Sequence, residues 1–265
     1  MRRFNIGKLL FLIVGGALSG AAYAGEAANF SMGVGLDYSS GKYGSSSTTE
    51  TTSIPVHALY ESGDWSLKMT VPYLFVTGDG SVIVSGGSGG RRGRSTIATT
   101  TTTARTTQSG LGDVVALANY YLVTSESGDS GLDVAGRIKF GTASETLGSG
   151  KNDYAAQLST YTTFGDLSPS LMLGYEVLGS SAALPLDNVV YGSVGAGYAF
   201  SKQTHAGAEY WYAQRASATG YEQREVSLYA NTRVGRDTYL RAYVMQGLSD
   251  GSPDNGYGLS LSAGF

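Results

Sequence analysis

Apolar and small residues alternate strictly through the segment NGYGLSLSAGF, residues 255–265. Its apolar positions are Tyr257, Leu259, Leu261, Ala263 and Phe265, and each position between them is glycine or serine. A period of two is typical of a β-strand with one apolar face. The opposite face carries only small side chains, so the pattern predicts a strand whose two faces meet different surroundings.

The same alternation recurs along the chain and predicts an all-β protein of about 12 strands, each as long as a tilted membrane strand requires. The segments are 30–38, 54–60, 65–73, 113–122, 132–140, 154–164, 171–177, 189–200, 206–212, 225–234, 238–244 and 255–265. Beyond residue 24, no stretch approaches the roughly 20 apolar residues of a membrane-spanning helix. The richness in tyrosine, glycine and threonine agrees with strands rather than helices.

Short and long connections alternate between these segments. The short ones are 61–64, 125–131, 165–168, 201–203 and 235–237, and longer Gly/Ser-rich segments lie near 40–50, 76–109, 142–152, 178–188, 214–222 and 247–256. Short periplasmic turns and long extracellular loops are typical of outer-membrane barrels. We therefore expect a closed antiparallel transmembrane up-and-down β-barrel, because closure leaves no unpaired strand edge in lipid. Segment 76–109 is expected to be a long extracellular loop or a protruding hairpin.

The first 24 residues predict a secretory signal peptide. Arg2, Arg3 and Lys8 precede the apolar run LLFLIVGGAL, and Ala22-Tyr23-Ala24 has the small-x-small form of a cleavage site. Removal of residues 1–24 takes the formal net charge from -3 to -6, because the three positive residues are the only charged ones in it. Residues 25–265 are then expected to form a single transmembrane domain in the bacterial outer membrane.

Aromatic residues fall mostly near the ends of the predicted strands, where their rings would lie at the membrane interfaces. Because the alternation continues to Phe265, we expect this residue to lie in the periplasmic girdle and to act as an assembly signal for the barrel-assembly machinery. The other expected partners are outer-membrane lipid and lipopolysaccharide. The arginines of the 76–109 segment are candidates for lipopolysaccharide phosphate, and a solvated polar loop is the alternative.

Charged residues occupy the inward parity of several strands. In LDVAGRIKF, Leu132 and Phe140 share the lipid face, which turns Arg137 and Lys139 inward. The same parity turns four more candidates toward the lumen: Glu209, Glu225, Arg233 and Arg241. Two interpretations remain open, a polar conduit that selects solutes and an interior filled with ion pairs.

The sequence carries no signature of an enzyme. Its two histidines, His57 and His205, lie in no spacing that suggests a catalytic triad, and His57 has inward parity. No His/Asp/Glu spacing predicts a metal site, so we expect no cofactor. The acidic mature chain also argues against nucleic-acid binding.

Three segments resemble the outer-membrane family named for the meta pathway of phenol degradation: SGLGDVVALANYYL (109–122), KFGTASETLGSGKNDY (139–154) and GLSDGSPDNGYGLSLSAGF (247–265). The resemblance implies a barrel that passes aromatic or other hydrophobic compounds. Two functions therefore stay open: an outer-membrane channel for small, hydrophobic or aromatic molecules, and a structural or surface-interaction barrel with a plugged lumen.

Overall fold

The computed structural model describes residues 29–80, 82–84, 96–98, 104–144, 146–182 and 184–265. The predicted signal peptide lies outside these residues, as does much of the 76–109 segment. The strands are β1 (Asn29–Gly41), β2 (Thr49–Ser62), β3 (Trp65–Gly78), β4 (Val82–Val84), β5 (Thr96–Ala98), β6 (Thr106–Leu111), β7 (Val114–Thr124), β8 (Ser130–Phe140), β9 (Asp153–Thr162), β10 (Leu167–Val177), β11 (Val189–Ala199), β12 (Thr204–Ala213), β13 (Gln223–Arg233), β14 (Thr238–Gly247) and β15 (Asn255–Gly264).

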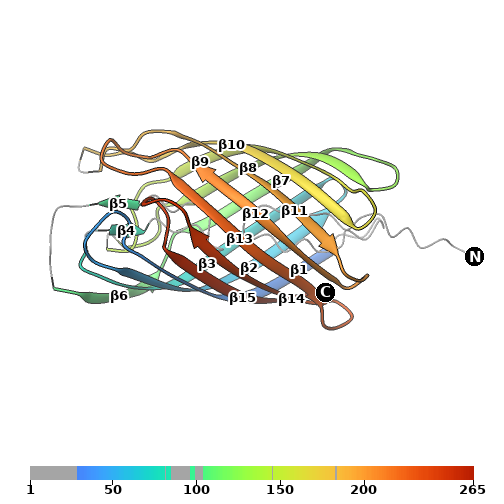
Figure 1. Cartoon of the computed structure of the whole chain (residues 1–265), viewed down its shortest axis with the longest axis horizontal. Helices are drawn as coiled ribbons and strands as arrows, with labels where there is room; N and C mark the ends of the chain where they lie inside the picture. The colour runs from blue at the N-terminus through green and yellow to red at the C-terminus, as the bar shows by residue number, and fades with distance from the viewer. Residues whose placement is uncertain (1–28, 81, 85–95, 99–103, 145, 183) are drawn as a thin grey trace, which may run out of the picture.

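Twelve of these strands form a closed antiparallel barrel, which confirms the predicted fold (Figure 1). Each pairs with its neighbour from β1 through β3, then β7 through β15, and β15 returns to β1. The closing seam runs from the Ser31–Gly264 pair to the Ser40–Asn255 pair. β6 is an additional strand that pairs with the outer end of β3. In the described residues, no helix is long and apolar enough to cross a membrane.

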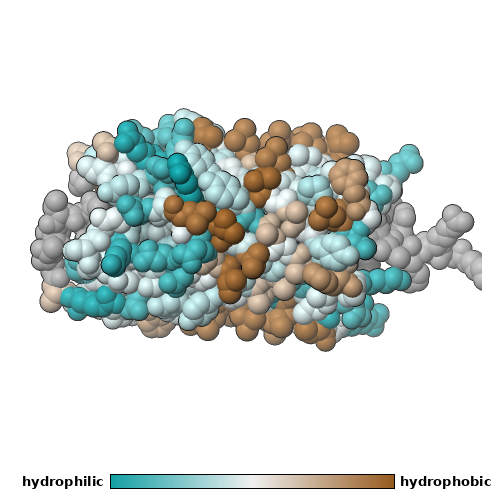
Figure 2. Space-filling model, viewed as in Figure 1, coloured by the Kyte–Doolittle hydropathy of each residue, from teal (hydrophilic) through white to brown (hydrophobic). Residues whose placement is uncertain are grey.

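The two faces of the wall have the predicted character. On β1, Met32, Val34 and Leu36 point outward and are 45%, 47% and 54% exposed, whereas Asp37 and Ser39 face inward and are buried. On the face that Figure 2 shows, apolar side chains gather across the middle of the barrel, with hydrophilic residues toward both ends. A closed barrel with an apolar belt satisfies its backbone hydrogen bonds in lipid, and this locates the protein in the bacterial outer membrane.

The connections differ in length at the two ends of the barrel. Short turns at 63–64, 125–129, 163–166, 200–203 and 234–237 lie at one end, and the longer segments lie at the other. Gly63 and Gly165 adopt positive φ values of 56° and 63° in two of the short turns, a conformation that glycine adopts without steric cost. Outer-membrane barrels have their short turns on the periplasmic side, so the end with the short turns is periplasmic.

Phe265 lies at the periplasmic end beside the start of β1. Its backbone N–H donates to the carbonyl oxygen of Phe30 at 2.8 Å, and the two ring centroids are 6.3 Å apart. Trp65 and Tyr120 form another outward aromatic pair, with centroids 4.8 Å apart. These rings occupy the girdle position that the sequence predicts, and the assembly role of Phe265 stays a prediction.

Near the extracellular mouth, the strands extend further than their apolar pattern indicates. β2 begins at Thr49 rather than Ile54, and β3 continues to Gly78. Residues 49–53 are polar on both faces, so they carry no period-two signal even though they are paired. β4 and β5 form a separate two-stranded sheet within the 76–109 segment.

Four arginines of the 76–109 segment are candidates for contact with lipopolysaccharide. The structure describes Arg105, whereas Arg91, Arg92 and Arg94 lie outside the described residues. The Arg105 guanidinium group forms an ion pair with Glu50 and donates to the carbonyl oxygen of Thr48 at 2.6 Å. Contact with lipopolysaccharide stays a prediction.

Candidate functional site

The lumen wall is the candidate functional site, and β8 shows how the sequence builds it. Asp133 and Lys139 are buried on its inward face, while Val134 and Ile138 point outward and are each 37% exposed. Arg137 shares the inward face, as parity predicts. Strand alternation therefore brings charged side chains into the interior without placing any of them against lipid.

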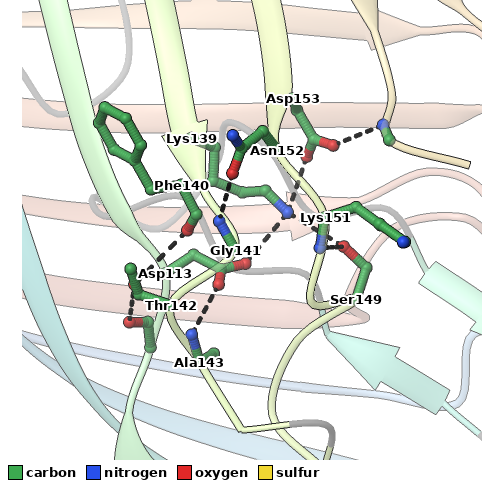
Figure 3. A network of polar contacts seen from close by, with 12 residues as sticks. Asp113, Lys139, Phe140, Gly141, Thr142, Ala143, Ser149, Lys151, Asn152 and Asp153 are labelled. Carbon is green, nitrogen blue, oxygen red and sulfur yellow. Dashed lines mark hydrogen bonds and ion pairs between the residues drawn. The ribbon is translucent and has the colours of Figure 1, made fainter.

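Lys139 is the centre of a buried polar network near the extracellular mouth (Figure 3). Its Nζ lies 3.0 Å from Asp113 Oδ2 and 2.8 Å from Asp153 Oδ2, and the three side chains are 2%, 0% and 3% exposed. It also donates to the Ser149 hydroxyl at 3.3 Å. One ammonium group faces two carboxylates here, so close pairing compensates one of the two buried negative charges and the other depends on hydrogen bonds.

Backbone groups hold both carboxylates in place. The N–H of Ala143 donates to Asp113 Oδ1 at 2.9 Å, and the N–H of Gly179 donates to Asp153 Oδ1 at 2.8 Å. Asp113 lies in the break between β6 and β7, Ala143 lies in the connection after β8, and Gly179 lies in the connection after β10. One lysine thus links three extracellular connections through its two partners.

Arg137 forms a second buried ion pair along the wall. Its Nη2 lies 2.7 Å from Glu176 Oε1, although β8 and β10 are separated by β9. Ala155 of β9 pairs with both residues in the register of the sheet. Because Ala155 is small, the guanidinium group reaches across it to the carboxylate. The Arg137 and Lys139 pairs therefore join strands of one wall.

An aromatic cluster continues from Arg137 around the wall. The guanidinium carbon lies 5.9 Å from the centroid of the Tyr191 ring, which stacks with Trp211 at a centroid distance of 5.3 Å. Met172 is buried in the same cluster. The Tyr191 hydroxyl donates to Gln157 Oε1 at 3.3 Å. Charged, aromatic and amide groups thus share the arc from β8 to β12.

Inward rings lie against glycines on the neighbouring strands. Tyr191 is paired with Gly174, and a side chain at Gly174 would meet the Tyr191 ring. The same arrangement occurs in four more pairs: His57–Gly33, Tyr161–Gly131, Tyr229–Gly207 and Tyr243–Gly258. The missing Cβ lets each ring lie along the wall instead of projecting across the lumen.

The remaining predicted lumen residues lie on β12, β13 and β14. Glu209 and Glu225 are each 4% exposed, on adjacent strands. Arg233 pairs with Tyr239 and is therefore a diagonal neighbour of Arg241. Arg241 lies over the Tyr229 ring, 5.6 Å from its centroid. The structure thus places all six predicted residues on the inner wall. Arg137 and Lys139 form one group on β8, and the other four form a second group on β12 to β14.

One arc of the inner wall carries mainly small side chains. The inward positions of β15 are Gly256, Gly258, Ser260, Ser262 and Gly264. β1 continues this lining with glycine or serine at most inward positions, whereas β2 does so only at its extracellular end, since its other inward positions are Pro55, His57, Leu59 and Glu61. In the ring of twelve strands β10 is the farthest from β1, so the small-residue arc of β15 and β1 faces β9 to β11, where Gln157, Tyr161, Met172, Glu176 and Tyr191 lie among small inward residues.

Sequence reasoning did not find Asp113, Asp153 and Glu176 as partners of the two cations. Asp153 and Glu176 lie on different strands from their partners and Asp113 lies in the break between β6 and β7, so only the arrangement of the strands brings them to the cations. The Gly-Leu-Gly-Asp segment at 110–113 was a usable signal, since its aspartate directly precedes β7. Among the described residues, no group of three or more His, Asp or Glu side chains is placed to hold a metal ion.

Comparison with known proteins identifies the fold. No protein-family model matches the chain, and no curated protein matches it. It is similar to the COG4313 outer membrane channel from Pseudomonas putida F1, with a TM-score of 0.66 and 13% identity over 92% of this chain and 97% of that chain. The KdgM porin has a TM-score of 0.50 and 11% identity over 89% of this chain and 99% of that chain. These similarities show an outer-membrane barrel fold, and the resemblance to the meta-pathway family stays a prediction.

Proposed function

We propose that the protein is an outer-membrane channel that passes small aromatic or other hydrophobic molecules through its lumen. The observation that carries the proposal is the small-residue arc of β15 and β1. Side chains just fill an eight-stranded barrel, and a twelve-stranded barrel is about 1.5 times as wide. Glycine and serine on one arc leave the wider interior less filled there, which favours a solute path along this arc.

Aromatic rings border the small-residue arc and support the choice of solute. Tyr243 of β14 lies against Gly258 of β15, and its hydroxyl donates to Asp37 Oδ1 of β1 at 2.8 Å. Tyr229 follows on β13 with Arg241 over its ring. Planar solutes stack on such rings, and the guanidinium group attracts ring faces or anionic substituents. The shared fold with an outer membrane channel supports the same function.

The alternative is a structural barrel with a plugged lumen, and it would need interactions that bind the wall to the material in the lumen. The ion pairs of Arg137 and Lys139 join strands within the wall instead. They stabilise the barrel whether or not the lumen conducts, so they do not favour a plug over a channel.

Single-channel conductance of the purified, refolded protein tests the proposal, together with liposome uptake of a small aromatic solute. Ser260 faces inward on the small-residue arc, whereas Leu259 is 52% exposed on the outer face. We expect Ser260→Trp to lower conductance and uptake severalfold, because the ring enters the proposed path, and Leu259→Trp to leave both unchanged. Baseline conductance of the folded wild-type protein would support the plugged barrel instead.

A further inference from the structure

The connection between β1 and β2, residues 42–48, begins with a turn of unusual sequence. Its central residues, Tyr43 and Gly44, have φ values of 53° and 74°. The N–H of Ser45 donates across the turn to the carbonyl oxygen of Lys42 at 2.9 Å. Positive φ at both central residues is typical of a type I′ turn, whose first central position is normally glycine, asparagine or aspartate. A tyrosine in this conformation is strained, and such strain persists where the surroundings hold the residue in place.

The surroundings of Tyr43 are the inner wall of the barrel. Its side chain is 3% exposed and packs against Val76 of β3. Val76 has the inward parity of Leu74, which is buried on the same strand. It pairs in register with Thr51 of β2, which is only 1% exposed although it lies near the extracellular end of the lumen. The turn therefore folds into the mouth of the barrel and covers part of the inner wall.

A second aromatic ring lies on the other side of this turn. Tyr221 belongs to the connection between β12 and β13, and a Cβ at Gly44 would lie 2.3 Å from its ring. In the ring of twelve strands, β13, β14, β15 and β1 lie between the two connections. The contact between Gly44 and Tyr221 therefore crosses the mouth above a third of the barrel.

The connection between β14 and β15, residues 248–254, packs between the other two. A Cβ at Gly41 would meet the backbone of Pro253, and the Ser249 hydroxyl donates to the carbonyl oxygen of Glu222 at 2.7 Å. Three connections thus contact one another above β15 and β1, the strands of the small-residue arc. A solute that follows this arc from the extracellular side has to pass the turn at Tyr43.

We propose that the turn at Tyr43 is the extracellular constriction of the channel and that the Tyr43 ring sets the largest solute that enters. The constriction rests on the proposed channel function and deepens it, because it names the residue that limits the size of the solute. Asparagine suits the first central position of a type I′ turn better than tyrosine and has a smaller side chain. The backbone alone would thus favour a residue that leaves the mouth wider.

Single-channel conductance of the refolded full chain tests the constriction, with polyethylene glycols of graded size as exclusion probes. Tyr43→Asn keeps a turn-compatible residue and removes the ring, so we expect conductance to rise severalfold and larger polymers to enter. Tyr221→Asn removes the ring on the other side of the turn and should change both quantities in the same direction.

Tyr154→Asn is the matched control, because it makes the same change at the extracellular end of β9 on the outer face, where Tyr154 is 50% exposed. It should leave conductance and the polymer limit unchanged. The heat-dependent shift in gel migration verifies that each variant is folded.

The outcomes separate the constriction from the channel. Equal conductance and an equal polymer limit in conducting wild type and Tyr43→Asn overturn the constriction alone, as does the same rise in Tyr154→Asn. Conductance that appears only in Tyr43→Asn supports the constriction and assigns the wild-type protein to the plugged barrel. Absence of conductance in wild type and in both mouth variants refutes the channel and the constriction together.

Discussion

Substitution of Lys139 by methionine removes the centre of the buried network while keeping a side chain of similar length. The carboxylates of Asp113 and Asp153 lose a partner at 3.0 Å and 2.8 Å. Breaking a buried ion pair by removing one partner costs about 3–5 kcal/mol. Each carboxylate keeps one backbone N–H donor, so we expect the lower end, about 3 kcal/mol, which is more than a hundredfold in the unfolding equilibrium.

Urea unfolding of the refolded protein, followed by tryptophan fluorescence and by the fraction of heat-modifiable barrel, measures this loss. A triple variant, Lys139→Met with Asp113→Asn and Asp153→Asn, removes the uncompensated charge, and we expect it to recover most of the stability. Arg224 is a matched control because its pair with Glu222 is half-exposed, and Arg224→Met should change stability by less than about 0.5 kcal/mol after screening by solvent. Wild-type stability in Lys139→Met, or a triple variant no more stable than the single one, would refute this account of the network.

Three further substitutions test other parts of the structure. Phe265→Asp should lower the amount of heat-modifiable barrel in outer membranes without affecting export, and a normal level would contradict the assembly role. Gly174→Ala should lower the unfolding free energy by about 1–3 kcal/mol because the new Cβ meets the Tyr191 ring. Gly136→Ala is the control, because its new Cβ meets nothing within 4 Å. Equal urea midpoints for the two variants would contradict this prediction. Arg241→Gln should move the reversal potential of the conducting channel toward cation selectivity, since a positive wall favours anions, and an unchanged potential would exclude this arginine from the path.

The sequence alone predicts the barrel and which residues point to lipid or to the lumen, because a strand in lipid requires an apolar side chain at every second position. Met32, Val34 and Leu36 carry that signal on β1. The signal fades where strands leave the membrane, so the outer part of β2 was missed. β6 was missed as well, because TTQSGL carries no apolar alternation.

The partners of the lumen charges could not be predicted, because a strand pattern contains no information about register between strands. Parity turns Arg137 inward, but only the pairing of β8, β9 and β10 brings Glu176 to it across Ala155.

The seam between β1 and β15 has a consequence for the order of biogenesis. Each of its ten registered pairs joins residues more than 200 positions apart, and the Tyr243–Asp37 hydrogen bond spans 206. Contacts of such high sequence separation form slowly, because a long loop must close before they contribute. Until β15 pairs with β1, one edge of β1 has unpaired backbone groups. Before insertion, the apolar outer face of the strands has no lipid to cover it. The chain must therefore cross the periplasm in a form protected from aggregation, and insertion cannot be completed strand by strand during synthesis.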